Sequence, residues 1–336
     1  MQGHPIAFFL AGLSLTVLGC EGHLGEGGHA PRPATGIDGT VLFDTPEADA
    51  ILAGMSVFPA DSAWNEEILD RPVHPDSSAI VGSIGASSPL SFNLDMNFVL
   101  IPSAQPPVHV DVVDYADESD PGPYPVPDNA PIEKWPLEGG SLDTLQRDGD
   151  GDRHMIVVDP GRGRLFELLG ARRTDQGWEA AQSSAFDLTS NAMRPEDWTS
   201  TDAAGLPIFP AIVRYDEVAS GIVRHAMRFT ASSSRRAYVY PARHFASGSD
   251  DPALPRMGER LRLRPDFDTS TFPPHARAVL EGLKLYGMLM ADNGLPWHIS
   301  IAPDRRIEGL ESLSQVRGSD FEVVVTTGEH EGPRAQ

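Results

Sequence analysis

The chain has 336 residues, with 48 acidic and 26 basic side chains and a net charge of −22. This balance excludes nucleic acids and anionic membrane surfaces as partners held by charge, because both bind through clustered lysine and arginine. The 32 glycines and 30 prolines predict many turns and loops, and a single cysteine excludes an intramolecular disulfide and a multi-cysteine zinc cluster.

The N-terminus has the pattern of an export signal. Residues 6–18 form an apolar run of signal-peptide length that is too short to stay in a bilayer as a spanning helix. The run ends in a Leu-Gly-Cys sequence that resembles a bacterial lipobox, although no Lys or Arg precedes it. We therefore predict a signal peptide over residues 1–19, lipidation of Cys20, a tether over residues 20–40 and a membrane-anchored protein at the cell surface or in the periplasm. A plain secretory signal with an incidental cysteine is the alternative.

Residues 41–330 are predicted to form one globular domain. Its first part, to about residue 85, contains short helical turns broken by prolines and is expected to wrap over the rest. Between residues 91 and 244, short runs with partial apolar alternation recur between turn signals. That rhythm is typical of an antiparallel β-sandwich or a jelly roll.

One long helix is predicted near the C-terminus, over residues 273–293. Pro273 and Pro274 suit its start, apolar residues recur at steps of three and four as far as Met290, and Asn293-Gly294 supplies a stop. The predicted fold is thus mainly β, a single sandwich or jelly-roll-like domain with this helix packed on a sheet.

Several phrases occur together in another group of proteins. The sequences WTSTDAAGLPIFP, VRYDEV, HAMRFT, YPARH and LKLYGMLMADNG, within residues 98–325, are similar to phrases found in the same order in a group of uncharacterised secreted bacterial proteins. The resemblance implies one exported, β-rich globular domain. It implies no activity, cofactor or catalytic residue.

The stretch from residue 212 to residue 230 carries the first candidate site. Asp216 is expected to cap a helical turn and Glu217 to lie in its first turn, where a helix favours negative charge. A strand is expected to follow, with His225 on its apolar face and Arg228 on the other. A hydrogen-bonded core histidine is the alternative to a catalytic one.

Two further segments are expected to meet this stretch. His244 ends a predicted strand, and Asp292 lies at the predicted helix end. We predict that His225 and His244 act as acid and base, that Glu217 or Asp292 supplies a carboxylate, and that Arg228 binds substrate oxygens.

Tryptophans lie in or beside several predicted loops. An exposed indole ring can stack on a sugar ring, although a buried tryptophan with a satisfied N–H is the more common case. Trp178, Trp198 and Trp297 are therefore predicted to bind substrate, and Trp135 lies in a similar position.

A second candidate is the acidic stretch with Asp114, Asp117, Glu118 and Asp120. Clustered carboxylates raise one another's pKa, and glycoside hydrolysis uses such a pair. If extension continues, Asp114, Glu118 and Asp120 share one side. A solvated strand edge is the alternative.

A third candidate is a metal loop. Asp148, Asp150 and Asp152 have the D-x-D-x-D spacing of calcium loops, with glycines between them, but Asp159 stands where an EF-hand has glutamate. The sequence predicts a structural calcium site, with a plain turn as the alternative, and predicts no organic cofactor.

The residues favour an extracellular function. No serine-hydrolase elbow, P-loop, zincin or dinucleotide motif is present in the sequence. We predict a surface-anchored carbohydrate-active enzyme, a hydrolase or lyase with an extracellular polysaccharide as its partner. The alternatives are a non-catalytic surface module that binds glycan or protein and a calcium-stabilised structural lipoprotein.

Overall fold

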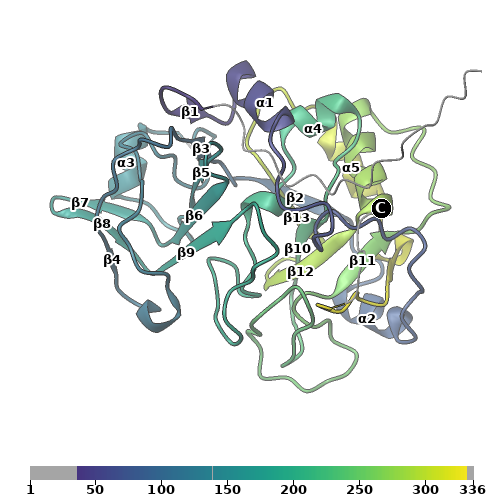
Figure 1. The fold of residues 1–336 in the computed structure, drawn as a ribbon. Helices are drawn as coiled ribbons and strands as arrows, with labels where there is room; N and C mark the ends of the chain where they lie inside the picture. Colours follow the sequence, from purple (N-terminus) through teal and green to yellow (C-terminus); the bar gives the residue numbers. More distant parts are fainter. Residues whose placement is uncertain (1–35, 138, 331–336) are drawn as a thin grey trace, which may run out of the picture.

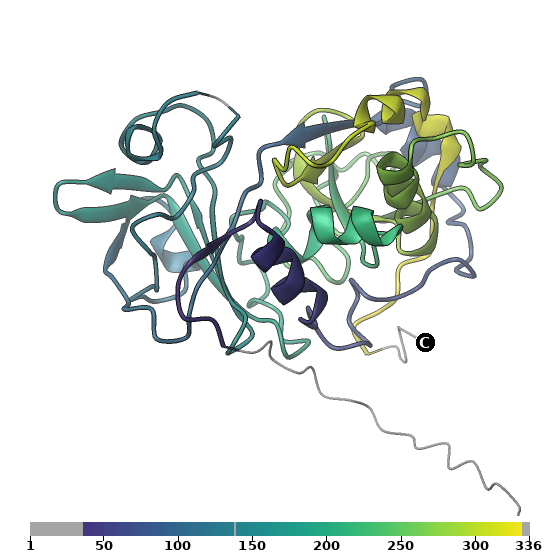
Figure 2. The ribbon, with the colours of Figure 1, turned by 90° about the horizontal axis from the view of Figure 1, so that it is seen from above.

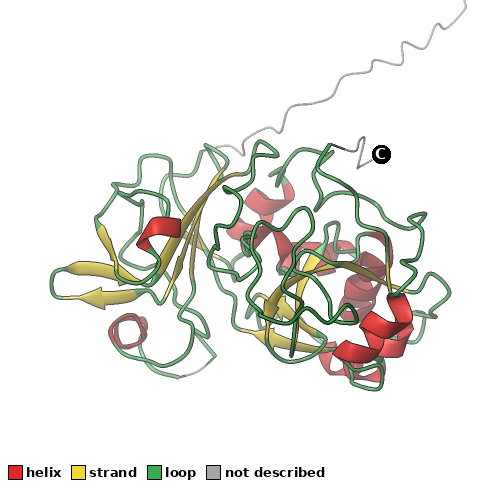
Figure 3. Cartoon of the chain, turned by 90° about the horizontal axis from the view of Figure 1, so that it is seen from below, coloured by secondary structure: helices red, strands yellow, loops and turns green. Residues whose placement is uncertain are grey.

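The computed structural model describes residues 36–137 and 139–330 (Figure 1). Cys20, the predicted signal peptide and most of the predicted tether lie outside the described residues. The described part is mainly β, as predicted, and forms three sheets. Each sheet contains both parallel and antiparallel pairs, so the predicted antiparallel sandwich is not observed. Loops make up much of the chain between these elements, as Figure 3 shows.

The first large sheet has five strands in the order β1-β3-β5-β6-β9. These strands are β1 (Val41–Leu42), β3 (Val99–Leu100), β5 (Met155–Asp159), β6 (Arg164–Leu169) and β9 (Gln182–Asp187). A small sheet with the order β4-β8-β7 lies beside it and consists of β4 (Val110–Val112), β7 (Arg172–Thr174) and β8 (Gly177–Ala180). The two sheets share an apolar cluster that includes Val99 and Met155 from the first and Val110 and Trp178 from the second.

The second large sheet has six strands in the order β14-β11-β12-β10-β13-β2. Its strands are β2 (Ser91–Leu94), β10 (Met227–Ala231), β11 (Arg260–Leu263), β12 (Met288–Asn293), β13 (His298–Ile301) and β14 (Phe321–Val323). The two large sheets lie side by side, the five-stranded sheet on the left in Figures 1 and 2. One apolar core contains residues of both, among them Leu100 and Phe186 from one and Met227 and Leu261 from the other.

The centre of the six-stranded sheet has one apolar and one polar face. Thr230 pairs with His298, which pairs with Ser91 on the next strand, and Ser300 pairs with Asn93. Alternate residues of a strand point to opposite faces, so these side chains share one face with Arg228. The intervening residues Met227, Phe229, Ile299 and Ile301 are fully buried. A polar sheet face in the interior requires partners for its groups, and it is here that the candidate site lies.

The helices are short. They are α1 (Pro46–Ala53), α2 (Ser77–Ile84), α3 (Leu142–Arg147), α4 (Tyr215–Ser220) and α5 (Pro274–Leu285), with 3₁₀ turns η1 (Ala116–Glu118), η2 (Phe209–Ala211), η3 (Leu310–Gln315) and η4 (Gly318–Asp320). None of the helices within residues 36–137 and 139–330 has the length and hydropathy to cross a membrane. Helices α4 and α5 pack together on the side of the six-stranded sheet (Figure 2).

The predicted long helix is wrong in its second half. Helix α5 begins at Pro274 as expected but ends at Leu285, and Gly287 follows with a left-handed φ of 66°. The segment after this turn is not helical but forms strand β12, parallel to β10. Apolar residues in a fully buried strand satisfy a helical pattern equally well, which explains the error. The strand predicted for residues 238–244 is also not observed, since only Tyr238 makes an isolated bridge there.

Candidate functional site

Arg228 is the centre of a buried polar cluster on the polar sheet face. Its Nε and Nη2 donate to the two carboxylate oxygens of Asp202 at 3.0 and 2.7 Å, and its Nη1 donates to Ser300 Oγ at 2.6 Å. The side chains of Arg228 and Asp202 are only 7% and 1% exposed, and a buried charge requires such pairing. The protein itself therefore occupies the donors that were predicted to bind substrate, and Arg228 acts by holding Asp202.

Asp292 lies at the end of β12, beside Thr230 of β10, and is partly exposed. One carboxyl oxygen accepts a hydrogen bond from the N–H of Asn293 at 2.7 Å and the other from the N–H of Ala203 at 3.4 Å. Burial and the negative charge of Asp202 raise the pKa of Asp292 to about 7, against the opposing charge of Arg228. A carboxyl group in this state still holds a proton near neutral pH, as a general acid requires.

His244 is held by the same backbone residue as Asp292. Its Nδ1 lies 2.8 Å from the carbonyl oxygen of Ala203, and since that oxygen only accepts, Nδ1 carries the proton. In this tautomer Nε2 is the acceptor nitrogen, and the ring is partly exposed. His244 and Asp292, both predicted catalytic residues, thus contact the C=O and the N–H of the same residue, Ala203.

Aromatic rings adjoin this pair. The ring of His244 stacks on Phe245 at 5.8 Å and 5°, and Phe245 stacks on Tyr238 at 6.5 Å and 18°. Trp198 comes from the segment that leads to Ala203, is partly exposed, and has the guanidinium of Arg194 5.4 Å from its ring centre. Planar apolar rings in this arrangement offer surface for the C–H faces of a sugar.

Two further titratable side chains reach the cluster, and the sequence analysis did not identify them. Asp95 lies in the loop between β2 and β3, and His154 directly precedes β5. Burial raises the pKa of Asp95 although the charge of Arg228 opposes it, while burial and Arg228 together lower the pKa of His154 to about 3. Asp95 Oδ1 and His154 Nδ1 are buried without a hydrogen-bond partner in the described part of the chain.

Glu133 and His298 complete the cluster. Glu133 Oε2 accepts the N–H of His154 at 3.1 Å, and burial together with the charges of Asp95 and Asp152 raises the pKa of Glu133 to about 7, although that N–H bond opposes the shift. His298 Nδ1 lies 2.8 Å from Ser91 Oγ, and burial followed by the charge of Arg228 lowers its pKa. A density of perturbed pKa values such as this is typical of functional sites.

The backbone beside these residues is strained. Four of the five non-glycine residues with positive φ in the described chain directly adjoin site residues, and such conformations concentrate at functional sites. They are Lys134, Arg153, Asp197 and Trp297, which adjoin Glu133, His154, Trp198 and His298.

The acidic stretch of the second candidate supports the Ala203 segment. Glu118 Oε2 accepts the N–H of Thr199 at 2.8 Å, and Asp120 Oδ2 accepts the N–H of Ala185 at 2.8 Å and pairs with Arg194. The 3₁₀ turn η1 interrupts extension here, so the predicted common side does not form. The two remaining carboxylates, Asp114 and Asp117, are exposed. The predicted carboxylate pair is therefore not observed. Glu118 and Asp120 instead hold the segment that carries Trp198, through Thr199 and Arg194.

Glu167 anchors the other end of that segment. This residue of β6 is fully buried and accepts the N–H groups of Ile208 and Phe209 at 2.9 Å each, together with Thr201 Oγ1 at 3.1 Å. Burial raises the pKa of Glu167 to about 7, although its hydrogen bonds oppose the shift. Residues 200–209 are thus fixed between both large sheets.

His225 and Glu217 lie at the opposite end of β10. His225 precedes the first residue of the strand, whereas Asp292 pairs near its last residue, so the predicted convergence of His225 with Asp292 is not observed. His225 Nδ1 lies 3.0 Å from the Ala226 carbonyl oxygen, and Nε2 lies 3.0 Å from Glu217 Oε1. Both ring nitrogens therefore face protein oxygens.

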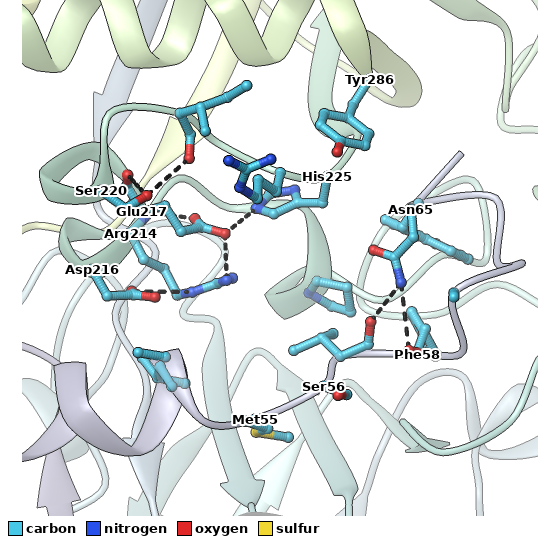
Figure 4. Close-up of a pocket in the computed structure, with 18 of the residues that line it drawn as sticks. Met55, Ser56, Phe58, Asn65, Arg214, Asp216, Glu217, Ser220, His225 and Tyr286 are labelled. Atoms are coloured by element: carbon cyan, nitrogen blue, oxygen red, sulfur yellow. Dashed lines mark hydrogen bonds and ion pairs between the residues drawn. The ribbon is translucent and has the colours of Figure 1, made fainter. Parts of the chain in front are cut away.

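Helix α4 supplies the groups around Glu217. Glu217 Oε1 accepts a hydrogen bond from Arg214 Nη2 at 2.6 Å, and Glu217 Oε2 accepts one from the backbone N–H of Arg214 at 3.1 Å (Figure 4). Glu217, and not Asp216, therefore caps the start of the helix. Burial raises the pKa of Asp216 to about 6, helped by Glu217 and opposed by Arg214. For Glu217, burial is outweighed by Arg214 and His225, and its pKa is lowered.

Two of the predicted substrate-binding tryptophans are buried, and this corrects their predicted role. Trp297 is fully buried, stacks between Phe229 and Phe321, and donates its indole N–H to Gly85 O at 2.8 Å. Trp178 is 6% exposed within the cluster of the small sheet, and Trp135 packs against the main core. Neither Trp178 nor Trp297 presents an indole face to solvent.

The predicted calcium loop is organised by an arginine. Arg153 donates to the carbonyl oxygens of Leu145, Gln146 and Ala171 at 2.8 to 3.0 Å, and its guanidinium lies against Gly149. Within residues 36–137 and 139–330, no three His, Cys, Asp or Glu side chains gather in a way that could hold a metal ion. Calcium binding by Asp148, Asp150 and Asp152 stays a prediction, which a melting temperature that falls on chelation would support.

No model of a protein family matches the chain, and no curated protein and no solved structure is significantly similar to it.

Proposed function

We propose that the protein is a surface-anchored, carbohydrate-active enzyme that cleaves an extracellular polysaccharide by hydrolysis or elimination. The observation that carries this proposal is the pair Asp292 and His244 on the backbone of Ala203. One member is a carboxyl group with a pKa of about 7, and the other is an imidazole whose Nδ1 faces a carbonyl oxygen, which leaves Nε2 as the nitrogen that can accept a proton. Partly exposed aromatic rings beside the pair give a sugar a surface on which to stack.

Each group has a defined task in cleavage. Asp292 donates its proton to the glycosidic oxygen as the bond to that oxygen breaks. His244 Nε2 takes a proton from the attacking water in hydrolysis, or from the carbon next to a uronate carboxylate in elimination. Asp202 takes no direct part in cleavage, because Arg228 binds both of its carboxylate oxygens. Burial, helped by the negative charge of Asp202, raises the pKa of Asp292.

A screen for polysaccharide cleavage tests the proposal. Soluble neutral and uronate polysaccharides are incubated with the protein. Hydrolysis is followed by the release of reducing ends, and elimination by the ultraviolet absorbance of the unsaturated uronates that it forms. Asp292→Asn and His244→Ala are each expected to lower kcat by about 10²- to 10⁴-fold, the usual contribution of one acid or base. His225→Ala tests the other end of β10. Full turnover in both Asp292→Asn and His244→Ala would overturn the assignment.

A non-catalytic glycan-binding module is the second candidate. The stacked rings of His244, Phe245 and Tyr238 favour it, since stacking alone can retain a glycan. A module of this kind would bind the same polysaccharides without releasing reducing ends, and Tyr238→Ala would weaken binding while Asp292→Asn would not.

A further inference from the structure

We propose that a cavity beside helix α4 is a separate binding site for a neutral mono- or disaccharide unit. The cavity has a volume of about 670 Å³ and lies between the segment from Leu52 to Glu67 and the start of β10. Figure 4 shows Glu217 between Arg214 and His225 on one side of it, and Asn65 and Phe58 across from them. A volume of this order holds a small ligand rather than a single water molecule.

The floor of the cavity is a compact charged network. The side chains of Arg214, Asp216, Glu217 and His225 are each 8% to 11% exposed and pair with one another. Arg214 Nε and Asp216 Oδ1 face each other at 3.6 Å, beyond hydrogen-bond distance, and His225 Nε2 faces Glu217 Oε1 at 3.0 Å. The indole N–H of Trp64, another lining residue, is buried without a hydrogen-bond partner among the described residues. Because nearly all buried polar groups in folded proteins are satisfied, this indole N–H and the long Arg214–Asp216 contact indicate room for a polar partner in the site.

The opposite wall combines apolar surface with single polar groups. Phe58 and Trp64 pack ring on ring at 4.8 Å, and Asn65 Nδ2 holds the chain around them through the carbonyl oxygens of Val57 and Pro59 at 3.0 Å each. Tyr286 lies at the rim, where its hydroxyl donates to Glu67.

These features select the class of ligand. The lining holds two arginines, Arg214 and Arg224, against three carboxylates, Glu67, Asp216 and Glu217, so it has no positive surplus with which to hold an anion. The network offers donors and acceptors side by side, and the wall offers aromatic carbon. A neutral sugar has this combination, with hydroxyls that both donate and accept and with apolar C–H faces.

The cavity is distinct from the Asp292 site. The two lie at opposite ends of β10, and Met227 to Thr230 alone is three residues of strand, or about 10 Å. The inference therefore goes beyond the proposed enzyme and does not depend on it: loss of turnover in Asp292→Asn leaves sugar binding at the cavity intact.

Saturation-transfer NMR on the full mature chain tests the inference. The probes are glucose, galactose, N-acetylglucosamine, cellobiose, maltose and lactose, with glucuronate and glucosamine as charged counterparts. Ser56→Trp fills the cavity from its exposed lip, and Ser314→Trp adds the same side chain at an exposed position outside the cavity lining. Ser56→Trp is expected to weaken binding of a neutral sugar more than tenfold, while Ser314→Trp and Asp292→Asn leave it unchanged.

A second variant probes the floor. Asp216→Ala removes one acceptor, and about a three- to tenfold weaker affinity is expected, the effect of one lost hydrogen bond. Melting curves show that each variant is folded. Binding of charged sugars alone, binding of no sugar, or equal binding by wild type and Ser56→Trp would overturn the proposal.

Discussion

Arg228 donates to both carboxylate oxygens of Asp202 in a part of the molecule from which water is almost excluded. Asp202→Asn keeps the shape of the side chain but removes its charge and leaves a buried guanidinium without its closest counter-ion. We expect the free energy of unfolding at pH 7 to fall by about 3 kcal/mol, because breaking one side of a buried ion pair leaves the other charge uncompensated. Urea unfolding followed by tryptophan fluorescence measures this loss.

The chain offers a matched control for that pair. Arg236 and Asp250 form the same two-bond contact, at 3.0 and 2.6 Å, but their side chains are 52% and 70% exposed. Asp250→Asn should cost less than about 1 kcal/mol, since water already screens these charges. Equal losses in the two variants would contradict the view that burial makes the Arg228 pair important.

The raised pKa of Asp292 predicts a specific pH dependence of stability. The folded chain keeps this proton up to about pH 7, whereas an unfolded aspartate loses it near its ordinary pKa of 3.8. The contribution of Asp292 to stability is therefore complete below about pH 4 and is lost as the pH rises through 7. Asp292→Asn does not titrate, so its stability relative to the wild type should increase by roughly 4 kcal/mol between pH 4 and pH 8.

Urea unfolding of both proteins at each pH unit measures the difference. A difference that stays constant across this range would show that Asp292 ionises normally. Asp202→Asn supplies the control for the cause: without the negative charge of Asp202, the pKa of Asp292 should drop and the pH dependence should become weaker.

Part of the candidate site could be predicted from the sequence. The acid, base and cationic side chains of Asp292, His244 and Arg228 identify these residues as candidates in the sequence. In the structure all three contact the segment that contains Asp202 and Ala203. The short strands at 91–94 and 298–301 also alternate polar and apolar residues, a signal for the polar face that was available in the sequence. The other titratable groups near that face could not be predicted, because Asp95 and His154 come from distant segments whose meeting depends on tertiary packing.

The mainly β character could also be predicted, but the sheet order could not. Turn residues divide the chain into short strands regardless of their partners, whereas parallel pairing of β10 with β12 depends on where α5 ends. A period of three to four apolar residues continues from the helix into the buried strand, so local patterning gives no boundary there. The boundary lies at Gly287, whose left-handed φ is not visible in the apolar pattern.

Gly287→Ala tests that boundary. The residue has a φ of 66°, and a Cβ there would lie 2.2 Å from the carbonyl oxygen of Leu261 and 2.7 Å from Ile68 Cδ1. Backbone strain and the clash together should cost about 3 kcal/mol or more in urea unfolding. Gly221→Ala is the matched control, because Gly221 also has a positive φ, 92°, but a Cβ there would meet nothing within 4 Å; about 1 kcal/mol is expected. Similar costs at both positions would exclude the close contact as the reason.

The lowered pKa of Glu217 predicts a pH dependence opposite to that of Asp292. Burial alone would raise this pKa, but Arg214 and His225 outweigh it, so ionised Glu217 stabilises the folded chain. That contribution is present above the ordinary pKa of 4.5 and is lost as the pH falls through the lower folded value. Glu217→Gln should therefore cost about 2–3 kcal/mol at pH 7, where it leaves Arg214 without its nearest carboxylate, and progressively less toward pH 3. Glu47→Gln changes an exposed glutamate in the first turn of α1 and should stay within about 0.5 kcal/mol of the wild type throughout. A Glu217→Gln deficit that is the same at pH 3 and pH 7 would mean that the amide fails for reasons of shape, and that the ion pairs with Arg214 and His225 add nothing to stability.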